Sequence, residues 1–198
     1  MLKLIFIRHA EPEVNKDVPS KIWEISEKGG TKAYEYLNEI KELSEINIVY
    51  SSMERKAIQT ARILLDLLPG QKTEITIKKD IRLNEVDRSK GKFYADEDIF
   101  EEKVKKSLLY MEKPVITGWE TAIDALRRFN EFVLELKQIH KRKKKGAIAI
   151  VSHGTVLNLY LAQVEGYISN YERILESWIE MPFCGWFVEE KNSVTRSW

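Results

Sequence analysis

Two of the three histidines in this 198-residue chain follow short apolar runs of sequence. Arg8 and His9 come directly after residues 2–7, and His153 comes two positions after residues 146–151. Arginine offers a planar fork of donors to an oxyanion. A neutral imidazole can attack phosphorus and carry a phosphoryl group covalently. These residue types therefore indicate phosphoryl chemistry.

Two further runs end in groups that suit the same chemistry. Residues 46–50 are followed by Arg55 and Lys56, and residues 74–81 lead to Glu85. A cation pair favours a phosphate dianion, and a glutamate whose pKa is raised by burial can protonate a leaving oxygen. The sequence contains no serine-nucleophile motif, phosphate-binding glycine loop or metal-ligand spacing that competes with this interpretation.

Strand-like and helix-like segments alternate along the chain, and these elements must position the polar groups. We expect strands at 2–7, 46–50, 74–81 and 146–151, with further strand-like runs at 174–179 and 185–189. We expect helices at 28–43, 99–110, 121–140 and 155–164. A further helix is expected to start at a capping box formed by Ser51 and Glu54 and to end near residue 68. The pattern predicts an α/β fold: a three-layer αβα sandwich with a mostly parallel central sheet and an antiparallel edge strand from the tail. In such sheets, ligands bind beyond the carboxyl ends of the strands.

Composition narrows the class of protein and of partner. The chain is 43% hydrophobic and 32% charged, and 32 basic residues nearly cancel 31 acidic ones. We therefore expect one globular domain over 1–198, with an insertion at about 86–117 over the active site, and no nucleic-acid or membrane partner. The single cysteine, Cys184, cannot form an intramolecular disulfide, which favours a free buried thiol and a cytoplasmic location.

Two other functional interpretations are weaker than the phosphoryl one. His140 could complete a metal-binding triad with His9 and His153, but it lies near the end of a predicted helix, where a surface histidine is favoured by the helix dipole. The basic run at 141–145 could bind nucleic acid, but it also follows that helix end, where cations are stabilised.

The ordered set of motifs resembles the histidine phosphatase superfamily, which is also called phosphoglycerate mutase-like. The resemblance covers about residues 2–165 and depends on the order of the segments, because each one alone is weak. The segments are RHA at 8–10, SEKG at 26–29 with KA at 32–33, SSMERKAIQTA at 51–61, RLNE at 82–85, WET at 119–121 and SHG at 152–154.

The resemblance implies a role for each matched residue. His9 would be the phosphorylated nucleophile, and Glu85 would donate and accept the proton. Arg8 and His153 would hold the phosphoryl group, and His153 would also stabilise the transition state. No metal or other cofactor would be needed. Asn15 and Gly154 fall at positions that suit a substrate contact, although Asn15 also suits the capping of a loop.

The chain departs from the family pattern at three places. Ala10 stands where the family has glycine, which narrows the backbone angles beside the nucleophile. The phosphate-binding arginine of the second motif falls in register on Lys56, with Arg55 one residue earlier; we favour Lys56 as the phosphate ligand. Glu120 lacks the glycine that usually precedes it and is expected to help start the helix that follows.

The resemblance leaves three functions to compare. A mutase would need extra fixed cations, including an arginine pair that residues 86–117 lack, so we expect a phosphomonoester phosphatase with a phosphohistidine intermediate. A cofactor-dependent phosphoglycerate mutase is the alternative. A non-catalytic phospho-ligand sensor is a third possibility, but such a protein would be expected to lose His9, His153 or Glu85. The substrate would be a small phosphomonoester or a phosphoprotein, and the sequence indicates neither which one nor the oligomeric state.

Overall fold

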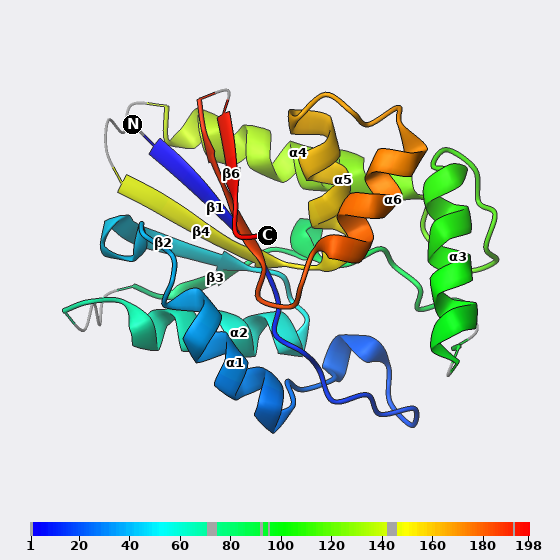
Figure 1. Cartoon of the computed structure of the whole chain (residues 1–198), viewed down its shortest axis with the longest axis horizontal. Coiled ribbons are helices and arrows are strands. Elements are labelled where there is room, and N and C mark those ends of the chain that lie inside the picture. The colour runs from blue at the N-terminus through cyan, green and yellow to red at the C-terminus, as the bar shows by residue number, and fades with distance from the viewer. Residues whose placement is uncertain (1, 71–74, 92, 95, 142–145, 192) are drawn as a thin grey trace.

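A six-stranded sheet forms the centre of the protein, in a computed structural model that describes residues 2–70, 75–91, 93–94, 96–141, 146–191 and 193–198 (Figure 1). The strand order is β3-β2-β4-β1-β5-β6. The strands are β1 (Leu2–Arg8), β2 (Ile46–Ser51), β3 (Ile77–Lys79), β4 (Gly146–Ser152), β5 (Trp186–Glu190) and β6 (Ser193–Arg196). The first four run parallel, while β5 pairs antiparallel with β1 and β6 pairs antiparallel with β5. This confirms the predicted α/β class and the antiparallel edge from the tail.

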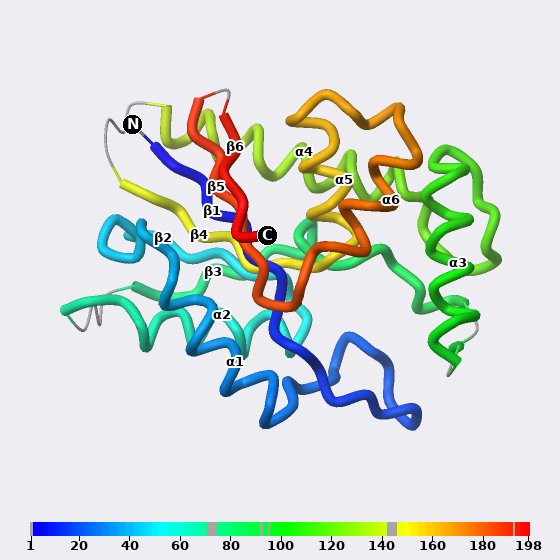
Figure 2. The backbone as a smooth tube through the Cα atoms, viewed as in Figure 1, coloured from blue at the N-terminus to red at the C-terminus, as the bar shows by residue number. Residues whose placement is uncertain are grey.

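Helices cover both faces of the sheet, so that two cores form (Figures 1 and 2). On one face lie α1 (Glu27–Leu37) and α2 (Arg55–Leu67), and on the other lie α4 (Ala122–Ile139), α5 (Gly154–Val164) and α6 (Tyr171–Glu180), with α3 (Glu97–Leu109) beyond α6. Alternate residues of β1 supply the two cores: Phe6 packs with α4 and α5, whereas Ile5 and Ile7 pack with α1 and α2. This is the two-residue period of a strand that is buried on both faces.

Two of the predicted elements are wrong. Residues 174–179 belong to the helix α6, because Asn170 caps it by accepting a hydrogen bond from Arg173 N, and Ile174 and Ser177 are buried one turn apart. The capping box at Ser51 does not form either: Ser51 Oγ donates to Ser52 O, and α2 begins only at Arg55. In addition, α1 ends at Leu37 rather than near residue 43.

The parallel strands β1, β2 and β4 end side by side at one edge of the sheet. Arg8 is paired with Ser152, and Ser51 with Val151, so the residues that follow these strands meet there. Short turns of 3-10 helix at Ser20–Ile22 and Ile81–Leu83 also approach this edge through contacts with Lys56 and Ser152. No helix among the described residues has the length and apolar character needed to cross a membrane.

Candidate active site

His9 lies at the end of β1 with its ring buried and its orientation fixed. Its Nδ1 is 2.7 Å from the carbonyl oxygen of Ala10, which can only accept, so Nδ1 carries the proton and Nε2 keeps its lone pair. The backbone on either side is also held, since His9 N donates to Ser152 O and Ala10 N donates to Thr60 Oγ1. Burial, together with the positive charges of Lys56 and Arg8 and the neighbouring His153, lowers the pKa of His9 well below its ordinary value of 6.5. The imidazole is therefore neutral at pH 7.

Arg8 lies beside His9 and forms no ion pair with a carboxylate of the described residues. Its Nη1 donates to Met181 O, while Nε is buried without a hydrogen-bond partner in the part of the chain that the structure describes. A Cβ at position 154 would lie 3.1 Å from Arg8 Nε, so Gly154 leaves room for the guanidinium. Burial lowers the pKa of Arg8, and the nearby Glu85 carboxylate opposes this effect. A guanidinium remains charged in proteins, so Arg8 is a half-buried cation whose buried Nε is an available donor.

His153 begins the turn into α5 and is completely buried. Its ring centroid lies 5.0 Å from that of His9, edge to face. His153 Nε2 is 2.7 Å from Ser52 Oγ, and Nδ1 is buried with no partner among the described residues. Burial and the Lys56 charge lower the pKa of His153 well below its ordinary value, so this ring is neutral as well.

The structure separates Lys56 from Arg55. The Lys56 side chain is only 7% exposed, and its Nζ donates to Ser20 O (2.9 Å) and to Glu54 Oε2 (2.6 Å). The Arg55 side chain is 58% exposed and pairs with Glu24. Because Lys56 acts electrostatically on both His9 and His153, it is the cation of this pair that faces the histidines.

Glu54 is a site residue that the sequence analysis missed. Its carboxylate is buried and accepts hydrogen bonds from Lys56 Nζ through Oε2 and from Glu85 N (3.0 Å) through Oε1. Oε1 also lies 3.6 Å from His153 Nε2. The spacing from Ser51 suggested a helix cap, and nothing local in the sequence indicates that the carboxylate turns inward instead.

Glu85 is held by two backbone donors. Oε1 accepts from Val86 N (2.9 Å) and Oε2 accepts from Thr155 N (3.1 Å) in the first turn of α5. The sequence analysis made proton donation by Glu85 conditional on a pKa raised by burial, and that condition is not met. Desolvation does oppose ionisation, but the Arg88 charge and the two backbone donors outweigh it and lower the pKa below its ordinary value of 4.5. Glu85 is ionised at pH 7.

The segment that carries Glu85 is fixed by an arginine on α4. Arg128 donates to the carbonyl oxygens of Arg82, Asn84 and Glu85, each at 2.8 Å. Its Nε and Nη2 also donate to the two carboxylate oxygens of Glu120 at 2.9 Å. Glu120 in turn accepts from Asp87 N, while the cap of α4 is Thr121. Glu120 thus binds the Glu85 segment to α4 rather than starting the helix.

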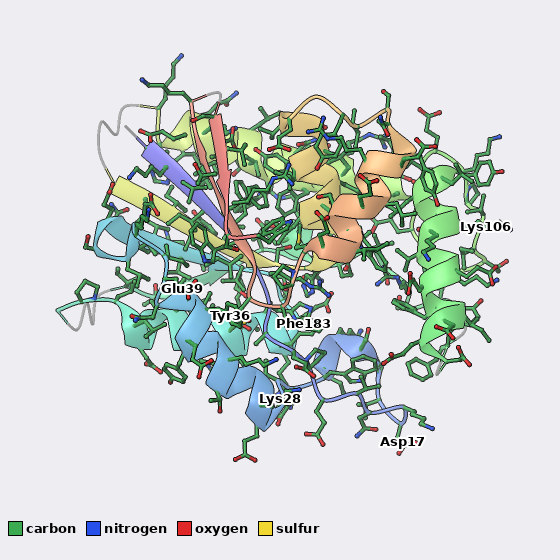
Figure 3. The ribbon with its side chains drawn as sticks, viewed as in Figure 1. Asp17, Lys28, Tyr36, Glu39, Lys106 and Phe183 are labelled. Atoms are coloured by element: carbon green, nitrogen blue, oxygen red, sulfur yellow. The ribbon has the colours of Figure 1, made fainter. Side chains whose placement is uncertain are left out.

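Phe183 is a second residue that the sequence analysis missed. It lies in the loop between α6 and β5, near the end of β1 (Figure 3). The Arg8 guanidinium carbon is 4.2 Å from the centroid of its ring, and the His9 ring centroid is 5.7 Å away.

The next residue, Cys184, has a positive φ of 61° and a buried free thiol whose pKa is raised by burial to about 12. The thiol is therefore protonated at neutral pH, as expected of an inert buried cysteine.

Asn15 is not among the residues that meet at this edge of the sheet. Its side chain is exposed and accepts a hydrogen bond from Asp17 N, which closes a turn at the tip of the loop after β1 (Figure 3). The predicted substrate contacts of Asn15 and Gly154 remain predictions.

Among the described residues, no group of three or more His, Cys, Asp or Glu side chains is arranged to hold a metal ion. The basic run at 141–145 lies outside the described residues, except for Lys141.

The arrangement therefore joins a neutral imidazole that has a free lone pair, two cations, a second neutral imidazole and an ionised carboxylate. These are the parts that nucleophilic transfer of a phosphoryl group requires: a nucleophile, ligands for the phosphoryl oxygens and a group that moves a proton.

Comparison with known proteins agrees with this chemistry. A family model described as the histidine phosphatase superfamily (branch 1) matches residues 4–175. No protein with a curated function matches the chain.

Similar folds occur among solved structures. Phosphoserine phosphatase from Entamoeba histolytica in complex with 3-phosphoglyceric acid superposes with a TM-score of 0.71 at 20% identity, over 100% of this chain and 95% of that one. A mutant of the same enzyme in complex with phosphoserine gives 0.69 at 19% identity, with the same coverage. Mycobacterial glucosyl-3-phosphoglycerate phosphatase gives 0.67 at 20% identity, over 94% and 88% of the two chains.

Proposed function

Because the chain belongs to the histidine phosphatase superfamily (branch 1), we propose that it hydrolyses phosphomonoesters through a phosphohistidine intermediate on His9. The observation that carries the proposal is the hydrogen bond from His9 Nδ1 to Ala10 O, which leaves the Nε2 lone pair of a buried, neutral ring free to attack. The phosphatases of similar fold support hydrolysis as the outcome.

In this proposal, Arg8 and Lys56 bind the phosphoryl oxygens. Arg8 offers a buried Nε with no partner, and Lys56 keeps one of its three ammonium donors after bonding Ser20 O and Glu54. His153 contributes a further donor. We assign the Ser52 hydroxyl as the donor to His153 Nε2, which places the histidine proton on Nδ1. That unpartnered N–H is available to a phosphoryl oxygen as charge develops.

Glu85 moves the proton in both steps. The substrate binds as a monoanion, and its proton passes to the ionised Glu85 and on to the ester oxygen as the P–O bond breaks and the bond from His9 Nε2 to phosphorus forms. In the second step, a water molecule attacks phosphorus and gives its proton to Glu85, and the P–N bond breaks to release phosphate. Because its pKa is lowered, Glu85 is ionised at neutral pH and is in the form that accepts a proton in this second step.

A chemical trap tests the intermediate directly. When the enzyme is quenched during turnover, the peptide that contains His9 is expected to carry a phosphoryl group that is lost in acid and survives in base. A His9→Ala variant should show no such adduct. A phosphoryl group on any other residue of the wild-type enzyme would contradict the proposal.

A further inference from the structure

Two half-buried arginines lack a carboxylate partner. Five arginine side chains among the described residues are not exposed. Three of them pair with acidic residues: Arg82 with Asp80, Arg128 with Glu120 and Arg196 with Glu165. Arg8 and Arg88 have no carboxylate oxygen within 4.0 Å in the described part of the chain. The ionised Glu85 carboxylate acts electrostatically on both guanidinium groups, but its oxygens are held by the backbone N of Val86 and Thr155. Buried Nε donors without a hydrogen-bond partner are costly, which indicates that an anion from outside the chain completes each of these sites.

The guanidinium of Arg88 lies between two aromatic rings and close to Glu85. Its central carbon is 4.7 Å from the Trp119 ring and 5.2 Å from the Phe100 ring. Its Nη2 donates to Thr155 Oγ1 at 3.3 Å, which is the one hydrogen bond that the described residues give this group, and Nε is buried without a partner. Thr155 N donates to Glu85 Oε2, so Arg88 and Glu85 contact the same residue.

This placement puts Arg88 on the side of the leaving group. In the proposed reaction, Glu85 gives a proton to the ester oxygen, whereas Arg8 and Lys56 bind the phosphoryl oxygens. A group that contacts Arg88 while the ester oxygen contacts Glu85 therefore belongs to the alcohol part of the substrate. The aromatic rings hold the guanidinium in one orientation, which preserves its ability to bind a planar group through two parallel hydrogen bonds.

We infer that Arg88 forms a second anion subsite, which binds a carboxylate on the alcohol part of the phosphomonoester substrate. A carboxylate carries one negative charge, which matches the single guanidinium of Arg88, whereas the dianionic phosphoryl group matches the two cations Arg8 and Lys56. The inference rests on the proposed function, since it places the second anion relative to the scissile bond. It assigns substrate discrimination to one residue of the segment that follows Glu85.

A matched pair of ligands tests the subsite without relying on turnover. 3-Phosphoglycerate and glycerol 3-phosphate differ by a carboxylate in place of a hydroxymethyl group. In a His9→Ala background, isothermal titration calorimetry should show 3-phosphoglycerate binding about tenfold more tightly or better, as expected of a charge-assisted hydrogen-bonded pair. An added Arg88→Gln change should reduce this ratio to about threefold or less, whereas Arg127→Gln, on the exposed side of α4, should preserve it.

Equal affinities for the two ligands in the His9→Ala protein would overturn the inference, and that measurement needs no change at Arg88. Retention of the full ratio in the Arg88→Gln protein would also overturn it. If the glutamine variant does not fold, Arg88→Lys, which keeps the charge and loses the planar fork, should give an intermediate ratio, and an unchanged ratio would count against the subsite. Hydrolysis of an aryl phosphate by the wild-type enzyme tests the proposed function separately, because that substrate has no carboxylate.

Discussion

Glu54 Oε2 lies 2.6 Å from Lys56 Nζ, and both side chains are buried at the proposed phosphoryl subsite. A carboxylate beside an anion-binding cation weakens the attraction of that cation for phosphate. The other oxygen of Glu54 holds the backbone N of Glu85, so one residue positions both the phosphate ligand and the proton carrier. In the proposed mechanism, Glu54 would therefore position the catalytic groups and limit the retention of product phosphate.

Replacing Glu54 by glutamine separates these two effects. Glu54→Gln should tighten competitive inhibition by inorganic phosphate roughly fivefold, because a negative charge near the anion is removed. It should lower kcat, because an amide has one acceptor where Lys56 and Glu85 N both need one. Steady-state kinetics with phosphate as inhibitor measures both kcat and the inhibition constant of phosphate. As a control, Glu24→Gln, which changes the partner of the exposed Arg55, should alter neither quantity. Phosphate inhibition that is unchanged or weaker would contradict this role.

Lys56 and Arg55 should differ sharply when each is removed. Lys56→Ala should weaken inhibition by phosphate or vanadate about tenfold or more, because a buried cation that faces both histidines is lost. Arg55→Ala should change it less than twofold, because this side chain is exposed and pairs with Glu24. The comparison is made well below the melting temperature, since Lys56→Ala leaves Glu54 without its partner. The reverse order of effects would refute the assignment of Lys56.

The sequence predicts the position of the site better than its internal contacts. Apolar runs that end in Arg8, His9 and His153 suffice to place these residues at one edge of a parallel sheet, because strand order brings the ends of β1 and β4 together. The ends of residues 46–50 and 74–81 likewise indicated Arg55, Lys56 and Glu85, and the ordered motifs then favoured Lys56 over Arg55. The local pattern also identified β1 to β5 and most helices, but it missed β6 (Ser193–Arg196) and took part of α6 for a strand. The buried Ile174 and Ser177 of α6 show the helical period only once the packing is known.

The missed residues depend on contacts between distant segments. Phe183 reaches Arg8 from the opposite end of the chain, through a loop in which Cys184 adopts a positive φ that is unusual outside glycine. Glu54 has the spacing of a helix cap, but Lys56 and Glu85 N compete successfully for its carboxylate. The direction of the pKa shift of Glu85 also depends on such contacts, because Arg88 and the two backbone donors outweigh the effect of burial.

Arg128 should contribute to both stability and catalysis. It donates to three carbonyl oxygens of the Glu85 segment and pairs with Glu120. Arg128→Lys removes the fork that makes these bonds, so thermal or urea unfolding should show a loss of about 2–4 kcal/mol in the free energy of unfolding. We expect kcat to fall about tenfold or more with a smaller change in KM, because Glu85 is displaced while the phosphoryl ligands remain. Arg127→Lys on the same helix should change neither, and a variant with intact kcat would contradict the positioning role.

The pH dependence of kcat/KM should reflect the lowered pKa values of His9 and Glu85. The active free enzyme has a neutral His9 and an ionised Glu85, and both groups reach these forms at a lower pH than usual. The acidic limb should therefore lie below pH 4.5, the ordinary value for Glu85. The falling limb should follow the second ionisation of the substrate, at about pH 6, and shift when an ester of different pKa is used. A rising limb centred near 6.5, the ordinary value for His9, would show that this ring titrates normally and would contradict the account.

The most direct test of the central claim is the hydrolysis of a generic aryl phosphate in the presence of a chelator, compared between the wild-type enzyme and His9→Ala. We predict turnover by the wild-type enzyme in chelator, because attack by His9 uses no metal, and a loss of at least about a thousandfold in the variant. The circular dichroism spectrum of the variant should match that of the wild type, which excludes misfolding as the cause. A His9→Ala protein with full activity, or a wild-type enzyme inactivated by the chelator, would contradict the proposed phosphohistidine mechanism.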